Sequence, residues 1–130
     1  MFSHVMFGTD DIQKSKKFYD ALMEVLGYSE GVIDEKGRCF YFTPNGVFGL
    51  TNPINGEPAT ASNGMTVGFN VTSTEQGDAW HAAGVANGGV SCEDAPGIRE
   101  GGPRRLYLAY LRDPSGHKIC ATYFPTPKSE

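Results

Sequence analysis

The sequence has few cysteines and no long apolar run, and both absences narrow what the chain can be. Its three cysteines, Cys39, Cys92 and Cys120, are widely separated and form no CxxC pair. A disulfide scaffold or a zinc knuckle is therefore not expected, and each cysteine is interpreted as a small buried apolar residue. No apolar stretch approaches the roughly 20 residues that span a bilayer, and residues 1–11 have no basic leader. We therefore expect a cytoplasmic protein with no membrane partner.

Basic residues are also too few and too scattered for a nucleic-acid-binding surface. Eleven Lys and Arg stand against fifteen Asp and Glu, which gives a formal net charge of -4. Nucleic-acid binding depends on clustered cations that contact phosphates. The best basic group is Arg104 and Arg105, with Arg99 and Arg112 nearby, and it is too small for a duplex. This group is either ordinary surface charge or a site for a small anionic ligand, and we expect no nucleic-acid partner.

Glycine and proline are abundant, and they divide the first half of the chain into short elements. Seventeen Gly and eight Pro indicate many turns. A strand is predicted over residues 2–7, followed by a helix over about residues 10–26 that is capped by Asp10 and stops at Gly27. Three short strands follow at residues 32–33, 38–42 and 46–50, separated by turns at 35–37 and 44–46. The predicted order is β-α-β-β-β.

The second half repeats this order after a polar connection over residues 51–64. A strand is predicted at residues 65–71, then a helix capped within residues 72–75 that ends near Gly88 and Gly89. A weak strand at 90–92 and a loop at 95–103 lead to a hairpin of residues 106–111 and 118–123. Two segments of about 60 residues thus share one order of elements although their sequences differ, which indicates an internal structural repeat.

Motifs at the two ends of the chain connect this repeat with a known family. The opening Phe2-Ser3-His4-Val5, followed by Asp10-Asp11-Ile12-Gln13 and by Ser15 and Phe18-Tyr19, resembles the family pattern "HV…D…S..FY". The later segment Asp113-Pro114-Ser115-Gly116-His117-Lys118-Ile119 is similar to the pattern "DP.GN.IE", and residues 64–69 fit the first strand of a second module. Over nearly its whole length the chain resembles the glyoxalase/bleomycin-resistance/dioxygenase superfamily, also called the vicinal oxygen chelate superfamily.

The resemblance implies an α+β fold for one domain of residues 1–130. Two βαβββ modules, about residues 1–52 and 64–125, would curl into half-barrel troughs around a ligand cavity. The resemblance also implies a homodimer, and an edge strand left unpaired by a half-barrel is a physical reason for association.

Metal-dependent members of this superfamily hold one divalent ion with His or Gln, Glu, His and Glu from four strands. The matching positions in this sequence are His4, Gly49, Thr66 and Cys120. Only His4 is a first-rank ligand and Cys120 is a candidate second one, whereas catalytic zinc sites generally use three protein ligands. His117 and Cys120 would lie on opposite faces of one strand, and His81 would face solvent. We predict no cofactor, with a divalent metal (Zn, Ni, Fe or Mg) at His4 as the alternative.

Candidate ligand-binding residues lie at these positions and beside them: His4, Gly49, Thr66, Arg104, Arg105, Tyr107 and Cys120. His4 and Cys120 are also the candidate catalytic pair, because an imidazolium nearby lowers the pKa of a thiol and makes it a base or nucleophile. The alternative is that Cys120 fills space on the inner face of the sheet and that His4 is a hydrogen-bonded cavity wall.

Three functions stay open at the level of sequence. The first is a metal-free protein that binds a small organic molecule, with aromatic residues lining the trough. The second is a metal-dependent lyase of the lactoylglutathione-lyase type, or a related superfamily enzyme, with a carboxylate such as Glu57, Glu93 or Asp94 rebuilding the site. The third is a dimeric interaction module. The first is the main hypothesis, and whether the protein is an enzyme stays open, because one fold hosts many functions.

Overall fold

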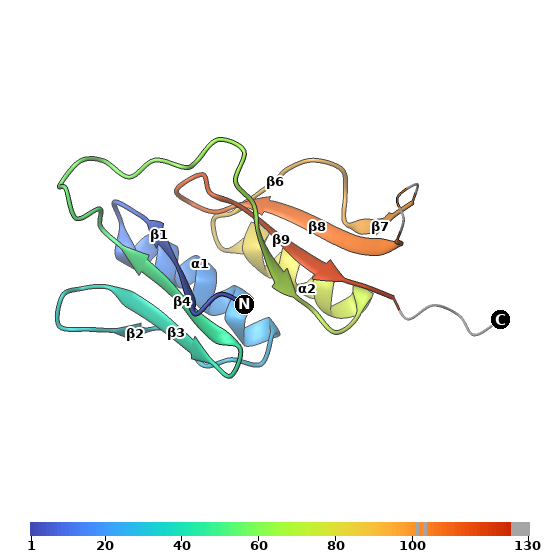
Figure 1. The fold of residues 1–130 in the computed structure, drawn as a ribbon, viewed down its shortest axis with the longest axis horizontal. Helices are drawn as coiled ribbons and strands as arrows, with labels where there is room; N and C mark the ends of the chain where they lie inside the picture. Colours follow the sequence, from blue (N-terminus) through green and yellow to red (C-terminus); the bar gives the residue numbers. More distant parts are fainter. Residues whose placement is uncertain (101, 103, 126–130) are drawn as a thin grey trace.

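The computed structural model describes residues 1–100, 102 and 104–125 and contains both predicted modules (Figure 1). Module one comprises β1 (His4–Gly8), α1 (Ile12–Val25), β2 (Val32–Ile33), β3 (Cys39–Thr43) and β4 (Gly46–Thr51). Module two comprises β5 (Val67–Asn70), α2 (Thr74–Ala86), β6 (Val90–Ser91), β7 (Gly97–Arg99), β8 (Leu106–Arg112) and β9 (Lys118–Tyr123). None of the described helices has both the length and the apolar composition that crossing a membrane requires.

The two sheets have the same topology, which confirms the predicted α+β fold and its repeat. Their strand orders are β1-β4-β3-β2 and β5-β9-β8-β6, and β7 pairs with β8 outside this path. In each module the first strand runs parallel to the last, and the other pairs are antiparallel. Both sheets are open rather than closed, so β1 and β5 remain edge strands.

The N-cap of helix α1 lies one residue later in the chain than predicted. Asp11, not Asp10, is the N-cap, and its side chain accepts a hydrogen bond of 3.0 Å from the Lys14 amide. The Asp10 carboxylate instead accepts a hydrogen bond of 2.8 Å from the Ala59 amide, which ties the connection between the modules to the start of α1. At the other end Gly27 has φ of +86°, the left-handed conformation predicted for a helix stop.

Two predictions for module two are wrong. The predicted loop 95–103, of which residues 101 and 103 lie outside the described residues, contains the short strand β7. The segment Gly97–Arg99 shows no apolar alternation that would predict a strand. Strand β7 forms because it pairs antiparallel with β8, where Ile98 lies opposite Tyr107. His81 is half-buried rather than facing solvent, and its Nε2 lies 3.0 Å from the Ser91 hydroxyl oxygen.

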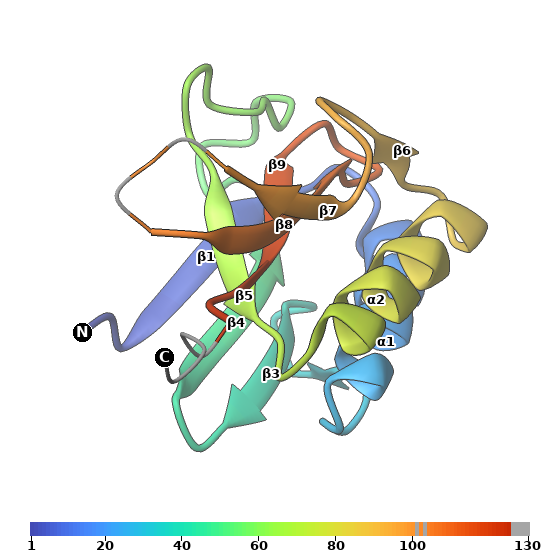
Figure 2. The ribbon, with the colours of Figure 1, turned by 90° about the vertical axis from the view of Figure 1, so that its right-hand side faces the viewer.

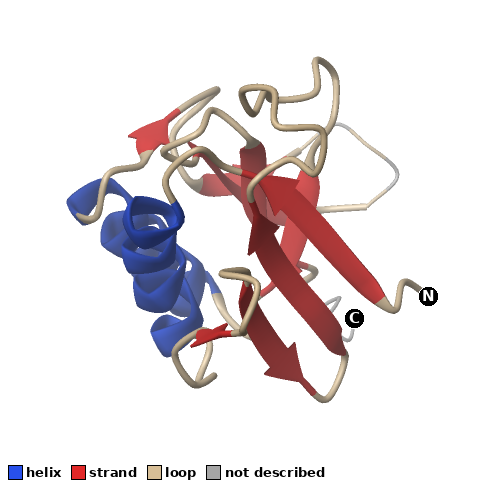
Figure 3. Ribbon diagram, turned by 90° about the vertical axis from the view of Figure 1, so that its left-hand side faces the viewer, coloured by secondary structure: helices blue, strands red, loops and turns tan. Residues whose placement is uncertain are grey.

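One hydrophobic core joins the modules. Helices α1 and α2 pack against each other and cover the same side of both sheets (Figures 2 and 3). The rings of Phe48 on β4 and Phe69 on β5 meet edge-on, with their centroids 5.5 Å apart. The centroids of the Phe69 and Trp80 rings, the latter on α2, are 6.0 Å apart. The Tyr19 hydroxyl of α1 also donates a hydrogen bond of 2.7 Å to Asp113 in the β8–β9 turn. These contacts fix the position of β1 relative to β5.

Candidate functional site

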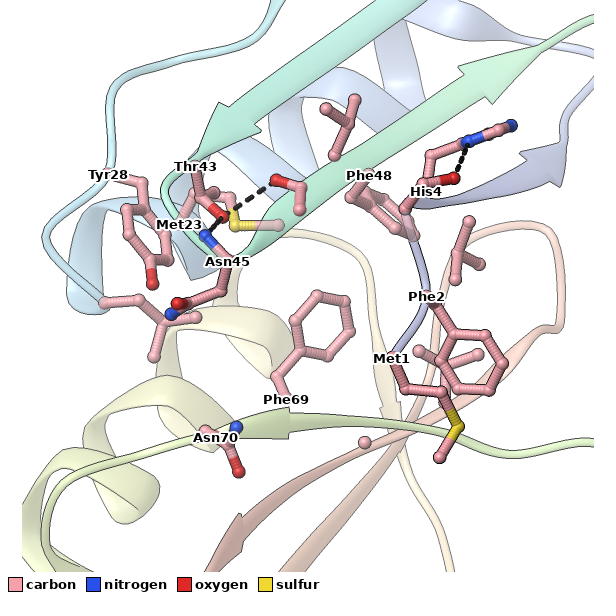
Figure 4. Close-up of a pocket in the computed structure, with 17 residues that line it drawn as sticks. Met1, Phe2, His4, Met23, Tyr28, Thr43, Asn45, Phe48, Phe69 and Asn70 are labelled. Atoms are coloured by element: carbon pink, nitrogen blue, oxygen red, sulfur yellow. Dashed lines mark hydrogen bonds between the residues drawn. The ribbon is translucent and has the colours of Figure 1, made fainter.

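A cavity of about 300 Å³ lies between the two modules (Figure 4). Module one contributes the segment before β1, the start of β1, the β3–β4 turn, the start of β4 and the C-terminal end of α1. Module two contributes β5. Because β1 and β5 are edge strands that do not pair with each other in the described structure, their facing ends leave room for a ligand.

One end of the cavity is apolar. Phe48 and Phe69 form its floor, and their rings belong to the core described above. Phe2 covers the opposite side, although the residue is 73% exposed. Figure 4 shows the rings of Phe2 and Phe69 on opposite sides of the space. A planar apolar group fits between such walls.

The other end carries polar and apolar groups together. Figure 4 shows Tyr28, Asn45 and Met23 near one another there, with Asn70 farther away on β5. The β3–β4 turn holds Asn45 in place, because the Thr43 hydroxyl donates to the Gly46 carbonyl at 2.8 Å and accepts from the Asn45 amide at 3.2 Å. Gly46 adopts φ of +144°, and a Cβ there would lie 3.3 Å from the Ser3 carbonyl oxygen, so glycine allows this close approach.

His4 is among the residues that line the cavity and is exposed, and in Figure 4 its imidazole points away from the space between Phe2 and Phe69. Its Nδ1 is 2.7 Å from the Ser3 hydroxyl oxygen, which fixes the orientation of the imidazole. Among the described residues that line the cavity there is no Asp, Glu, Lys or Arg. Met1, which carries the amino terminus of the chain, and His4 are the lining residues that can bring a positive charge to the cavity.

A second cavity, of about 330 Å³, lies at the start of α1 and is a weaker candidate. Its hydroxyl groups already bind each other: Thr9 and Ser15 lie 2.8 Å apart, and Ser115 donates to Thr9 at 3.1 Å. Polar groups that are satisfied internally gain little from a ligand. The cavity between the modules is therefore the candidate site.

Of the seven residues predicted to bind ligand, His4 lines this cavity and the other six lie elsewhere. Thr66 immediately precedes β5, so it adjoins the cavity residue Val67. Cys120 pairs with the cavity residue Gly68 one strand away and is 5% exposed. Tyr107 is only 1% exposed and donates a hydrogen bond of 2.6 Å to Asp78 on α2, so it belongs to the core.

The two arginines also lie outside the cavity. Arg105 forms an ion pair of 2.9 Å with Glu100, and the Arg104 guanidinium lies 4.4 Å from the centre of the Phe124 ring. Both arginines are exposed, as expected of ordinary surface charge.

The four family metal positions do not fit a divalent ion in this chain. Gly49 supplies no ligand, and a Cβ at that position would overlap the Met6 thioether and lie 3.1 Å from the Phe40 ring. Met6 thus covers the place from which an acidic side chain would extend. Within residues 1–100, 102 and 104–125, no three His, Cys, Asp or Glu side chains are grouped so that they could hold a metal ion.

The carboxylates considered as replacements do not line the cavity either. Glu57 lies exposed in the connection between the modules. Glu93 pairs with Lys118, and it has φ of +58°. Asp94 contributes its carbonyl oxygen, which accepts a hydrogen bond of 3.2 Å from Arg99.

Cys120 is a protonated thiol in this environment. Burial raises its pKa, and this effect outweighs the Thr122 hydroxyl, 3.4 Å from the sulfur, and the charge of Lys118, both of which lower it. A thiol with a raised pKa is a poor nucleophile at neutral pH. The geometry therefore favours the space-filling interpretation of Cys120 over the catalytic one.

Sequence reasoning missed Phe2, Tyr28, Asn45 and Asn70 as site residues. Asn45 was placed only in a turn, and Tyr28 follows the helix stop at Gly27. One signal was available: β1 and β5 are equivalent strands of a repeat, so the residues at their ends are natural neighbours in a two-module fold. Nothing in the sequence indicates that the β3–β4 turn lies beside the ends of β1 and β5.

The family model of the Glyoxalase/Bleomycin resistance protein/Dioxygenase superfamily matches residues 1–121. Among solved structures, a glyoxalase/bleomycin resistance protein from Albidiferax ferrireducens T118 is 60% identical, with a TM-score of 0.90 over 94% of this chain and 98% of that chain. A glyoxalase-related enzyme from Fulvimarina pelagi is 22% identical, with a TM-score of 0.73 over 96% of this chain and 88% of that one. A lactoylglutathione lyase from Agrobacterium tumefaciens is 20% identical, with a TM-score of 0.64 over 94% and 92%. No curated protein matches the chain significantly.

Proposed function

This chain belongs to the Glyoxalase/Bleomycin resistance protein/Dioxygenase superfamily, and we propose that it binds a small organic molecule in the cavity between its two modules. The observation that carries this proposal is the cavity itself. Its volume of about 300 Å³ is at the lower end of the range of ligand sites, and apolar side chains with a few polar groups line it.

Binding without metal chemistry is the form of this function that the residues favour. The family positions hold Gly49, Thr66 and Cys120 beside His4, and Met6 covers Gly49. Glyoxalase chemistry needs a base that moves a proton next to a carbonyl, and a glycine supplies none. The 60% identical relative is named a glyoxalase/bleomycin resistance protein, and a role in holding a molecule agrees with the second part of that name.

We also propose that the protein forms a homodimer. The face of the module-one sheet that points away from the helices presents Phe40 and Phe42, and Phe42 is 65% exposed. Val32, which pairs with Phe40, is 56% exposed on the same face. A second copy that covers this face would bury apolar surface that solvent otherwise contacts.

A ligand screen with a blocked cavity tests the binding proposal. Thermal denaturation of the wild type is measured against a library of small organic molecules, and each hit is repeated on Val47→Trp, whose added ring fills the cavity. Val85→Trp is the matched control, because Val85 is 48% exposed on α2 and does not line the cavity. Hits should raise the midpoint temperature of thermal denaturation for the wild type and Val85→Trp but not for Val47→Trp. Hits that stabilise all three proteins equally would place binding elsewhere and refute the proposal.

A further inference from the structure

We infer that Asn63, in the connection between the modules, is a site of spontaneous modification at which the side-chain amide becomes a carboxylate. The sequence contains four Asn-Gly dipeptides, at residues 45–46, 55–56, 63–64 and 87–88. Asparagine is a thermally labile residue, and a following glycine, which has no Cβ, leaves the Asn side chain open to the next backbone amide. Because all four share this local sequence, the structure around each one decides which of them reacts.

The reaction needs only the chain itself and water. The Gly64 amide nitrogen forms a bond to Cγ of Asn63, the bond from Cγ to Nδ2 breaks, and the Gly64 amide proton leaves with Nδ2 as ammonia. A succinimide ring remains, and water opens it at either of its carbonyls to give aspartate or isoaspartate. The chain therefore exchanges ammonia for water and gains a negative charge, and the reaction is independent of any ligand in the cavity.

Asn63 and Gly64 are held only weakly. Both are exposed, and within the described residues neither the Asn63 side chain nor the Gly64 amide makes a hydrogen bond. They are the central residues of a turn whose closing hydrogen bond, from the Met65 amide to the Ser62 carbonyl, is long at 3.4 Å. Gly64 has φ of +96°, and a Cβ there would have no neighbour within 4 Å. The peptide can therefore rotate until the Gly64 nitrogen meets Cγ of Asn63.

Asn55 and Gly56 are equally exposed in the same connection, but hydrogen bonds hold them. The Gly56 amide, which is the group that must attack, donates a hydrogen bond of 3.1 Å to the Pro53 carbonyl. The side-chain oxygen of Asn55 accepts a hydrogen bond of 3.0 Å from the Glu57 amide. Both bonds must open before the reaction can occur, and a neutral hydrogen bond of about 1 kcal/mol corresponds to about a fivefold slower rate.

Secondary structure holds the other two dipeptides. In the β3–β4 hairpin Gly46 pairs with Thr43, whose hydroxyl donates a hydrogen bond of 2.8 Å to the Gly46 carbonyl. At the end of α2, Asn87 is half-buried, and its side-chain amide donates a hydrogen bond of 2.8 Å to the Ala83 carbonyl. Asn45 and Asn87 should therefore also react more slowly than Asn63. Since Asn45 lines the cavity, its protection keeps a new carboxylate out of the proposed binding site.

Conversion at each Asn is measured after incubation of the wild type at mildly alkaline pH in water labelled with heavy oxygen, which enters only the product formed during the incubation. Peptides are then made with pepsin in acid, where the reaction is slow, and are sequenced by tandem mass spectrometry. We expect Asn63 to react at least about fivefold faster than each of the other three. In urea, which removes the hydrogen bonds of the fold, the four rates should become similar.

A variant tests the protection itself. Thr43→Val removes the hydroxyl that bonds to the Asn45–Gly46 turn, so it should raise the rate at Asn45 about fivefold and leave the rate at Asn63 unchanged. A rate at Asn63 no higher than at Asn55 in the folded protein would overturn the inference. So would an order of rates that persists unchanged in urea, because local sequence rather than the fold would then determine it.

Discussion

Gly49 is the residue at which this chain departs most clearly from a metal-binding site. Glycine supplies no ligand, and the Met6 side chain lies where a Cβ at this position would be. A carboxylate introduced at this position alone would therefore meet Met6. The missing ligand and the occupied space both act against metal binding on this face.

The first prediction concerns metal binding. Wild-type protein exposed to Zn²⁺, Ni²⁺, Fe²⁺ or Mg²⁺ should retain no stoichiometric ion in native mass spectrometry. Restoring the family pattern with Gly49→Glu, Thr66→His and Cys120→Glu, together with Met6→Ala to make room, should give a protein that retains one. Fewer than three protein ligands hold these ions weakly, whereas four form a site. An ion bound by the wild type and lost in His4→Ala would contradict this prediction.

A second prediction at this scale concerns Tyr19, whose buried hydroxyl donates to Asp113. Tyr19→Phe leaves a buried carboxylate oxygen without its partner, so the free energy of unfolding should fall by about 1–3 kcal/mol. Chemical denaturation measures this change. Tyr110→Phe is the control, because the Tyr110 hydroxyl makes no hydrogen bond within the described residues, and it should change stability by less than about 0.5 kcal/mol. Equal effects of the two substitutions would show that the Tyr19–Asp113 bond does not stabilise the contact between the modules.

Helix α2 illustrates packing that overrides helix propensity. Gly84 is buried, and a Cβ there would overlap the Leu111 side chain and lie 3.3 Å from both Leu22 and Phe18. Alanine at Gly84 would gain about 1 kcal/mol of intrinsic helix propensity, but overpacking typically costs about 1–3 kcal/mol. Because the neighbours are fully buried, Gly84→Ala should lower the free energy of unfolding by up to about 2 kcal/mol, measured by urea denaturation. Val85→Ala, at an exposed position on the same helix, should instead be neutral or stabilising.

The link between α1 and β3 predicts a sensitivity to acid. Burial raises the pKa of the Asp20 carboxyl, but hydrogen bonds from the Gly31 amide, Lys16 and Tyr41 outweigh it, and the net pKa is lowered. A lowered pKa contributes stability above the unfolded value of about 4, and this contribution is lost as pH falls through the folded value. The stability difference between wild type and Asp20→Asn should therefore shrink as pH falls below about 4. Glu57→Gln, an exposed carboxylate in the connection, should show no such narrowing.

The elements of this fold were predictable where local chemistry determines them. Helix α1 follows from its apolar spacing and the Gly27 stop, and the hairpin turns follow from Gly37, Gly46 and Gly116, all of which have positive φ. Strand β7 was missed because its three residues carry no periodic signal. Its pairing with β8 is a tertiary event, and tertiary contacts override weak local preference.

The site was less predictable because its residues meet only through packing of the two modules. His4 was predicted as a site residue from a motif, and it is one of the residues that line the cavity. Tyr28, Asn45 and Asn70 come from a helix end, a turn and a strand in different modules, and no spacing rule connects them. Tyr107 was predicted to bind ligand but does not line the cavity. Strand alternation turns its side chain toward α2, where its hydroxyl donates a hydrogen bond to Asp78.

At the scale of the whole molecule, the helices cover one side of both sheets and leave the other side of the module-one sheet apolar and exposed. Phe42 lies 5.9 Å from Phe40 on that side, and its pairing partner Val47 also lines the cavity. A second copy bound there would lie close to the cavity and shield it from solvent. Ligand binding and association are therefore expected to be coupled, with ligand stabilising the dimer.

The last prediction tests this association. The wild type should be a dimer at micromolar concentration in sedimentation velocity, and Phe42→Glu should shift it to monomer. Burying a Phe side chain contributes about 1.5–3 kcal/mol, so replacing it on both copies and adding two charges should weaken dimerisation by at least about a hundredfold. Val85→Glu introduces the same charge on the exposed side of α2 and should leave the dimer intact. A wild type that stays monomeric at these concentrations would refute the homodimer, and a dimer unaffected by Phe42→Glu would place the interface on another face.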